Sequence, residues 1–277
     1  MPGLRQPAGE LNGRPSLDAT GEYAGWLSSG NHPTELVVVE LATGRTDRHR
    51  VPLAGRCRSF HWSKSPGVGL AVVDADGAED CQLYRVRPGE GRWQPVAGPH
   101  ARQVRVVAQS ELRPREIVVS LLDGTAEQAE YRRIDLVTGA GQTLLRDRGF
   151  AAVYFDHQLR PRLFETVDEL GSRLIFDGDP DHGRLFLRIE HRDGMCVRFV
   201  DFTADGRSVH FVMPDGEQGV RLVRLPLTGG PAAAATLCRA DKADFTELFF
   251  DGADLQLAQV EGERTECRPF DAAAAAV

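Results

Sequence analysis

One stretch of sequence decides the fold, and it reads Tyr131-Arg132-Arg133-Ile134-Asp135-Leu136-Val137-Thr138-Gly139. Its aromatic and β-branched residues favour a β-strand, and its Thr-Gly end favours a tight turn. The same arrangement occurs at residues 36–44, 84–89 and 221–229, where a strand-like run again ends in a glycine turn. The chain is therefore an internal repeat, and the length of the repeat decides which architecture it builds.

The spacing of these glycine turns matches the blades of a β-propeller. Gly44, Gly139 and Gly229 are separated by about 95 and about 90 residues, or two periods of roughly 45–48 residues each. The second interval requires a further copy near its midpoint, where Gly171 and Gly183 are weak candidates. Another pair of strand-like runs precedes each copy, so a repeat holds about four short antiparallel strands.

Such a repeat cannot bury its own faces, and its copies must stack around an axis. Dividing the 277 residues by a period of about 46 predicts about six blades. We therefore expect an all-β fold, a β-propeller of about six four-stranded antiparallel blades or an incomplete seven. We expect an N-terminal extension at residues 1–14, the propeller at 15–270 and a disordered tail at 271–277.

Composition and charge exclude several functions. The net charge is −7 and both signs are spread along the chain, which argues against nucleic-acid binding. No run of about 18 apolar residues and no apolar leader occurs, so we expect no membrane segment, no signal peptide and a cytoplasmic protein. Lys64 and Lys242 are the only lysines beside many arginines, a bias typical of GC-rich genomes such as those of actinobacteria.

Metal and cofactor sites are not expected. The five cysteines form no C-x-x-C pair, so we interpret them as reduced and mostly structural thiols. Residues 177–183 resemble a calcium loop, but the glycine comes one position late and Arg188 stands where the bidentate glutamate belongs. We interpret this segment as a solvated turn between strands, and the sequence predicts neither a metal nor a cofactor.

Candidate binding residues come from the first strand of each repeat. Pockets in propellers form where the innermost strands converge, and arginine suits a carboxylate, sulfate or phosphate through bidentate hydrogen bonds. The alternative is that these groups form ordinary salt bridges on the surface or between blades, and that His61 is a structural histidine. The candidate substrate-binding residues, which would suit a small anionic molecule, are His61, Arg105, Tyr154, Arg160, Arg162 and Asp201.

The chain resembles the N-terminal propeller of the prolyl oligopeptidase family, in its acylaminoacyl-peptidase and dipeptidyl-peptidase branch. The resemblance covers most of residues 15–270 and concerns the scaffold rather than the chemistry. It implies a propeller fold that is commonly seven-bladed. The runs that carry it are Trp62-Ser63 and residues 69–73, 81–86, 113–119, 131–139 and 149–162.

One departure from the family bears on function. Family members follow the propeller with an α/β-hydrolase domain that carries Gly-x-Ser-x-Gly, and this motif is missing from the 277 residues. The family's catalytic residues therefore have no counterpart here, and we expect no standalone serine peptidase. Nothing in the sequence identifies a catalytic residue.

Two functions remain open. The chain could pair with a separately encoded protein to bind and orient a small substrate in a two-component enzyme, for example in natural-product biosynthesis. Alternatively, it could be a non-catalytic binding or gating scaffold. The partner is expected because an unclosed propeller leaves strand edges that recruit another chain, whereas six complete blades closed by the N-terminal strand would need none.

Overall fold

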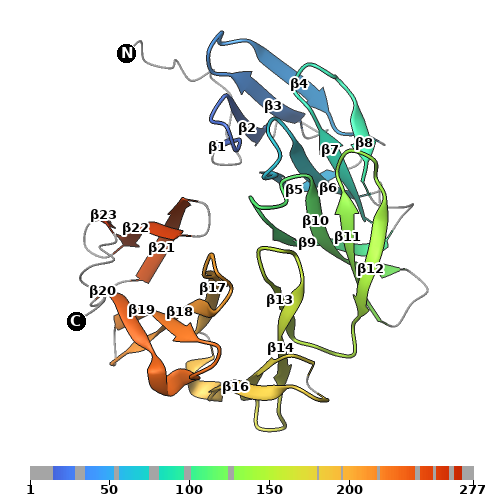
Figure 1. Cartoon of the computed structure of the whole chain (residues 1–277). Coiled ribbons are helices and arrows are strands. Elements are labelled where there is room, and N and C mark those ends of the chain that lie inside the picture. The colour runs from blue at the N-terminus through green and yellow to red at the C-terminus, as the bar shows by residue number, and fades with distance from the viewer. Residues whose placement is uncertain are drawn as a thin grey trace. The chain divides into compact units, whose positions relative to one another are not determined.

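The computed structural model of the chain consists almost entirely of antiparallel strands (Figure 1). It describes residues 15–28, 35–52, 56–74, 81–96, 101–123, 128–179, 181–194, 196–216, 219–240, 244–251, 254–261 and 265–269. Two 3-10 turns, η2 (His191–Asp193) and η3 (Pro231–Ala233), occur between strands. The chain divides into two compact units, Met1–Arg148 and Gly149–Val277, and each is described separately.

The first unit contains three meanders of four antiparallel strands, which are the first three blades. The first blade is β1 (Ser16–Leu17), β2 (Tyr23–Ser28), β3 (Glu35–Glu40) and β4 (Thr46–Arg50). The second is β5 (Arg56–Trp62), β6 (Gly69–Asp74), β7 (Cys81–Val86) and β8 (Trp93–Pro95). The third is β9 (Ala101–Gln109), β10 (Glu116–Asp123), β11 (Glu130–Asp135) and β12 (Gly141–Arg146). The second and third blades join edge to edge through one pair, Cys81 opposite Ala101.

The second unit continues the pattern with three more blades. The fourth blade is β13 (Ala152–Phe155), β14 (Pro161–Val167), β15 (Arg173–Asp177) and β16 (Arg184–Ile189). The fifth is β17 (Arg198–Phe202), β18 (Ser208–Asp215), β19 (Gly219–Pro226) and β20 (Ala235–Ala240). The sixth has three described strands, β21 (Asp244–Asp251), β22 (Asp254–Glu261) and β23 (Thr265–Pro269).

These meanders confirm the predicted propeller of four-stranded antiparallel blades. The repeat that decided the fold is the third strand of each blade together with the turn that follows it. The copy that could not be placed is β15 with its turn at Gly178, which has a positive φ of 86°. Gly183 lies at the end of that turn, whereas Gly171 belongs to the preceding turn between β14 and β15 and is not part of the repeat. The expected extension, 1–14, and tail, 271–277, lie outside the described residues.

Apolar side chains from neighbouring blades pack face to face and form the cores. In the first unit, one cluster joins the second and third blades and includes Leu70, Leu83, Val104, Ile117 and Ile134. The aliphatic side chains of β3 and the aromatic side chains of β5 fill the space between the first and second blades. Each fully buried side chain of this size contributes about 1.5–3 kcal/mol to folding. The cores therefore hold adjacent blades together rather than filling single sheets.

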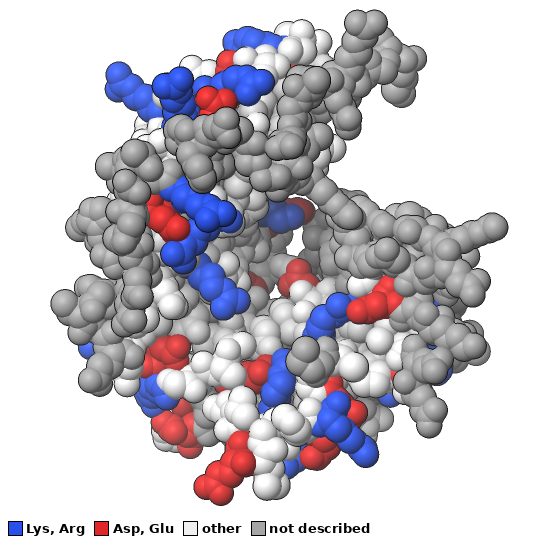
Figure 2. Space-filling view, turned by 180° about the vertical axis from the view of Figure 1, so that it is seen from behind, with Lys and Arg blue, Asp and Glu red and all other residues white. Residues whose placement is uncertain are grey.

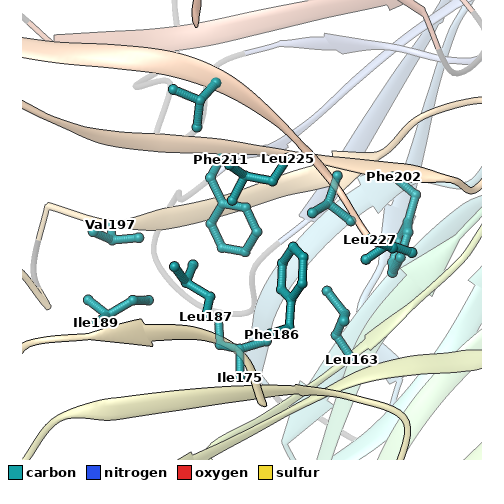
Figure 3. Close-up of a cluster of buried hydrophobic side chains, with 12 residues drawn as sticks. Leu163, Ile175, Phe186, Leu187, Ile189, Val197, Phe202, Phe211, Leu225 and Leu227 are labelled. Atoms are coloured by element: carbon teal, nitrogen blue, oxygen red, sulfur yellow. The ribbon is translucent and has the colours of Figure 1, made fainter. Parts of the chain in front are cut away.

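The second unit has the larger aromatic core. Phe202 and Phe211 of the fifth blade are 0% exposed and face Leu163, Ile175 and other side chains of the fourth blade (Figure 3). Phe199 packs on both phenylalanines, with its ring centroid 5.5 Å from that of Phe202 and 5.6 Å from that of Phe211. This cluster fixes the first and second strands of the fifth blade against the fourth.

The surface carries charges of both signs. On the face shown in Figure 2, Lys and Arg side chains lie next to Asp and Glu side chains over most of the described area. Many of them form exposed ion pairs, such as Lys64 with Glu111 and Arg188 with Asp168. Exposed pairs of this kind contribute only about 0–1 kcal/mol each. Within the described residues, no helix is long and apolar enough to cross a membrane.

Candidate functional site

A small polar residue recurs at the end of the first strand of each blade, where the chain turns toward the second strand. Its side chain accepts a hydrogen bond from a backbone N–H of its own turn in each of the first five blades. This contact satisfies a donor that the turn would otherwise leave unpaired. The residues, 45–48 positions apart, are Asp18, Ser63, Ser110, Asp156 and Thr203, and Asp251 holds the same place in the sixth blade.

Several of these turns also contact the equivalent turn of the next blade. Asp18 Oδ2 accepts a hydrogen bond from the backbone N–H of Gly67, and the N–H of Lys64 donates to Gln109 Oε1. In the second unit, His157 Nε2 lies 2.9 Å from the carbonyl oxygen of Phe202. Because a carbonyl oxygen only accepts, this ring nitrogen of His157 carries a proton. The turns therefore connect neighbouring blades at one end of their strands.

The side chain of Asp156 accepts four hydrogen bonds from its own turn. Its side chain is 3% exposed. Its Oδ1 accepts the backbone N–H groups of Gln158 and Arg160, at 2.9 and 3.0 Å. Its Oδ2 accepts Nε and Nη2 of Arg160, at 3.0 and 2.8 Å. Burial acts to raise the pKa of Asp156, but these hydrogen bonds outweigh it and hold the pKa below its usual value of 3.8.

The backbone of this turn is strained at one position. Leu159 has a φ of 57°, which is left-handed and uncommon for a leucine, and it is the one such non-glycine residue among those described. The side chain of Leu159 is 0% exposed. Burial of the leucine and the four hydrogen bonds to Asp156 hold the turn in this conformation, which places Arg160 on the surface.

The second predicted arginine lies beside the same carboxylate. Arg162 Nη1 is 3.5 Å from Asp156 Oδ2, and its side chain is 32% exposed, against 63% for Arg160. The same guanidinium lies close to Gly206 in the turn of the fifth blade. The structure therefore brings two of the predicted residues together around one buried acid.

Tyr154 belongs to a different network, inside the fourth blade. Its hydroxyl donates to Glu165 Oε2 at 2.6 Å, and Glu165 is 4% exposed. Arg173 donates Nε and Nη2 to the two oxygens of Glu165, at 2.7 and 2.9 Å. Its Nη1 donates to the carbonyl oxygens of Gly194 and Val197, in the segment that leads into the fifth blade. Burial and the hydrogen bond to Glu165 raise the pKa of Tyr154, so the hydroxyl stays protonated.

Asp201 lies on β17, beside His157. The distance from His157 Nε2 to Asp201 Oδ1 is 3.8 Å, and Asp201 Oδ1 also accepts the backbone N–H of Phe202. The ring of Phe199, on the same strand, lies 4.3 Å from the ring of Tyr154. Four of the six predicted residues thus lie in the second unit. Three of them, Tyr154, Arg162 and Asp201, lie at contacts between the fourth and fifth blades. The contacts of Arg160 stay within the fourth blade.

The remaining two predicted residues lie in the first unit. His61 is half-buried on β5, and burial lowers its pKa below 6.5. Arg105 is exposed on β9, opposite Ser120 of β10. Burial and the nearby Asp147 raise the pKa of Tyr131 to about 12, and Arg105 counteracts this in part. That all six residues bind a substrate remains a prediction.

Buried histidines give the chain a measurable pH dependence. Burial lowers the pKa of His49 and of His61 below the usual 6.5. Below pH 6.5 the unfolded chain therefore binds protons that the folded chain does not, so their contribution to stability is complete above that pH and decreases below it. We expect the free energy of unfolding, from urea titrations between pH 7 and about 5, to fall less in the variant His49→Gln/His61→Gln than in the wild type.

The matched control is His182→Gln, at an exposed position in the turn between β15 and β16. It should leave the free energy of unfolding at pH 7 within about 0.5 kcal/mol of the wild type. An equally steep slope in the double variant and the wild type would show that neither buried histidine carries the effect.

The described cysteines and possible metal ligands can also be placed. Four described cysteines form no disulfide, and burial raises the pKa of Cys57 to about 12, which keeps it protonated. The predicted solvated turn at 177–183 does connect β15 and β16. No group of three or more His, Cys, Asp or Glu side chains in the described chain is arranged to hold a metal ion.

Two parts of this arrangement were not predicted from the sequence. The first is the role of Asp156, although its place in a repeat with Asp18, Ser63 and Ser110 is visible in the sequence. Glu165 and Arg173 were not singled out, because their pairing depends on how β14 and β15 are aligned.

Comparison with known proteins agrees with the fold. No family model matches the chain. It is 24% identical over 254 residues to dipeptidyl aminopeptidase BIII of Pseudoxanthomonas mexicana, a match that covers 90% of this chain and 35% of that protein. The chain therefore spans about a third of this curated relative.

Solved structures give the same result. A prolyl endopeptidase aligns with a TM-score of 0.61 at 15% identity, over 96% of this chain and 40% of that chain. The propeller domain of the trilobed protease from Pyrococcus furiosus aligns with a TM-score of 0.56 at 13% identity, over 94% of this chain and 78% of that one. The expected resemblance is confirmed, and the chain is a β-propeller domain related to the propellers of prolyl oligopeptidase-type peptidases.

Proposed function

We propose that the chain is a non-catalytic binding and gating propeller, which works with a hydrolase-type protein encoded separately. One observation carries the proposal: the buried ionisable groups of the fourth blade join blades together and are not available for chemistry. Glu165 is held by both Arg173 and Tyr154, and Arg173 also donates to two carbonyl oxygens of the segment after the blade. A general base needs an accessible proton path, whereas this carboxylate is 4% exposed and already accepts three hydrogen bonds.

The relatives support the pairing with a hydrolase. Their names describe a dipeptidyl aminopeptidase, prolyl endopeptidases and acylaminoacyl peptidases, of which the chain spans only 35–43%. The propeller of the trilobed protease is described as having an open velcro topology. We propose that the partner contacts the outer edge of β23, which has no further strand beside it among the described residues. An unpaired strand edge is a natural site for another chain to bind.

A second candidate function is that the propeller also orients a small substrate, as one half of a two-component biosynthetic enzyme. It is favoured by the two guanidinium groups of Arg160 and Arg162 at the surface beside Asp156. Orientation alone can supply a large share of a rate enhancement when the reacting groups belong to one molecule. In this form the propeller contributes binding and positioning, and the partner contributes any nucleophile.

Co-expression with a neighbouring reading frame that encodes a hydrolase tests the main proposal. We expect a stoichiometric complex by size-exclusion chromatography with light scattering, and hydrolysis of peptide substrates only when both chains are present. A serine-directed fluorophosphonate should label the partner and leave this chain unlabelled.

Variants separate the two candidate functions. If Arg105→Ala and Arg160→Ala leave the activity of the complex unchanged while disrupted assembly abolishes it, the chain is a scaffold. If Arg160→Ala raises KM while assembly is intact, the chain also binds substrate. Labelling of this chain itself, or a monodisperse monomer that forms no complex, would overturn the proposal.

A further inference from the structure

Arg162 has hydrogen-bonding capacity that the described part of the chain does not use. Its guanidinium carries five N–H donors. Its nearest acidic partner is Asp156 Oδ2 at 3.5 Å, an ion-pair distance at which no hydrogen bond to the carboxylate forms. The side chain is 32% exposed and lies against Gly206 of the fifth blade, so it is held in place but open to solvent.

Asp156 has no acceptor site left for a hydrogen bond from Arg162, because its sites are already filled. An ionised carboxylate offers about four lone-pair sites. Asp156 receives four hydrogen bonds, two on Oδ1 from backbone N–H groups and two on Oδ2 from the guanidinium of Arg160. Arg162 therefore remains beside the carboxylate as a second cation with free donors.

The local charge favours a further anion. Two guanidinium groups surround one carboxylate, which leaves an excess of one positive charge at the turn. A guanidinium with free donors binds a carboxylate or phosphate through two parallel hydrogen bonds, and such charge-assisted bonds are the stronger kind. Gly206 has no side chain that could cover Arg162 Nη1. A Cβ placed on this glycine would lie 3.9 Å from that nitrogen.

We propose that Arg162, assisted by Arg160, forms a binding site for a compact oxyanion, either a carboxylate or a phosphate. Asp156 orients Arg160 and contributes no direct contact to the anion. The site rests on the second candidate function and deepens it, since it names the chemical class of ligand, and because it lies within this chain it does not depend on the proposed partner.

Calorimetric titration of the full chain tests the site with three probes: acetyl-dialanine, its C-terminal amide and inorganic phosphate. We expect saturable binding of at least one anion and none of the amide. Arg162→Gln should weaken that binding about 10- to 100-fold, the effect of losing charge-assisted hydrogen bonds. Arg162→Lys should bind with intermediate affinity, because the charge stays while the planar fork is lost.

The control is Arg192→Gln, since Arg192 is 85% exposed and far from the turn in sequence. It should leave binding unchanged, and thermal unfolding should show that each variant is folded. Binding of the free peptide alone identifies a carboxylate site, and binding of phosphate alone identifies a phosphate site. Equal binding of the amide, equal weakening by Arg192→Gln, or no saturable binding of either anion would overturn the proposal, whether or not the partner complex forms.

Discussion

Replacing Arg173 with alanine is expected to lower the free energy of unfolding by about 3–5 kcal/mol. The reason is that the buried carboxyl group of Glu165 would lose both hydrogen bonds from Arg173 and its partner of opposite charge. The carbonyl oxygens of Gly194 and Val197 would lose their donor as well. The side chain of Arg173 is only 21% exposed and that of Glu165 only 6%, so water replaces little of what is lost. Urea unfolding followed by far-UV circular dichroism measures the difference.

A double-mutant cycle shows that the effect comes from the pair. Glu165→Ala alone should also destabilise the chain, since it leaves the guanidinium of Arg173 without its acid. The double variant should cost less than the sum of the single variants, because no uncompensated charge remains in the interior. Additive single effects would contradict this account.

Two further variants give smaller expected losses of stability, against which the loss for Arg173→Ala can be compared. Tyr154→Phe removes one hydrogen bond to a charged acceptor and should cost about 1.5–3 kcal/mol. Arg192→Ala removes an arginine that is 85% exposed and lies 3.7 Å from Asp193, and it should stay within about 0.5 kcal/mol of the wild type. A loss for Arg173→Ala as small as that of Arg192→Ala would show that the network does not hold the fourth and fifth blades together.

The sequence was sufficient to predict the fold because the repeat combines two independent signals. Strand-like runs such as 131–139 predict the secondary structure, and the spacing between the runs predicts the length of one propeller blade. The copy at β15 was not recognised because its turn begins with Asp177-Gly178 in place of Thr-Gly. The residues at the ends of the first strands, 45–48 positions apart, are spaced more regularly than the glycine turns. In the first five blades each of them accepts a hydrogen bond from its own turn, which ties its identity to that position.

The site could be predicted only in part. Strand phase placed Tyr154 and Asp201 on first strands, and the turn sequence placed Arg160 and Arg162 close together. Strand phase does not reveal hydrogen-bond partners, so the engagement of Tyr154 by Glu165 was not predicted. Glu165 and Arg173 are not opposite each other in the β14–β15 ladder, where Glu165 faces Ile175, and the long arginine side chain reaches across. Contacts of this diagonal kind depend on register and rotamer.

Phe211→Ala is the other substitution with a large expected effect, about 3–5 kcal/mol of lost stability. The ring is 0% exposed on β18 and is part of the cluster that joins the fourth and fifth blades (Figure 3). Its removal leaves a cavity in this cluster beside Phe199, and a strand paired on both sides cannot collapse to fill it.

The spectroscopic signal used to follow unfolding of the Phe211→Ala variant must report on the second unit. All three tryptophans, Trp26, Trp62 and Trp93, lie in the first unit, so tryptophan fluorescence does not report on the environment of Phe211. Far-UV circular dichroism in urea follows the strands of both units and is the appropriate signal. Phe211→Leu should recover more than half of the loss, because leucine refills most of the cavity. Leu170→Ala, at a turn position that is 77% exposed, should change stability by less than about 0.5 kcal/mol. If Phe211→Ala were as mild as Leu170→Ala, the packing of the fourth blade on the fifth would not depend on this aromatic core.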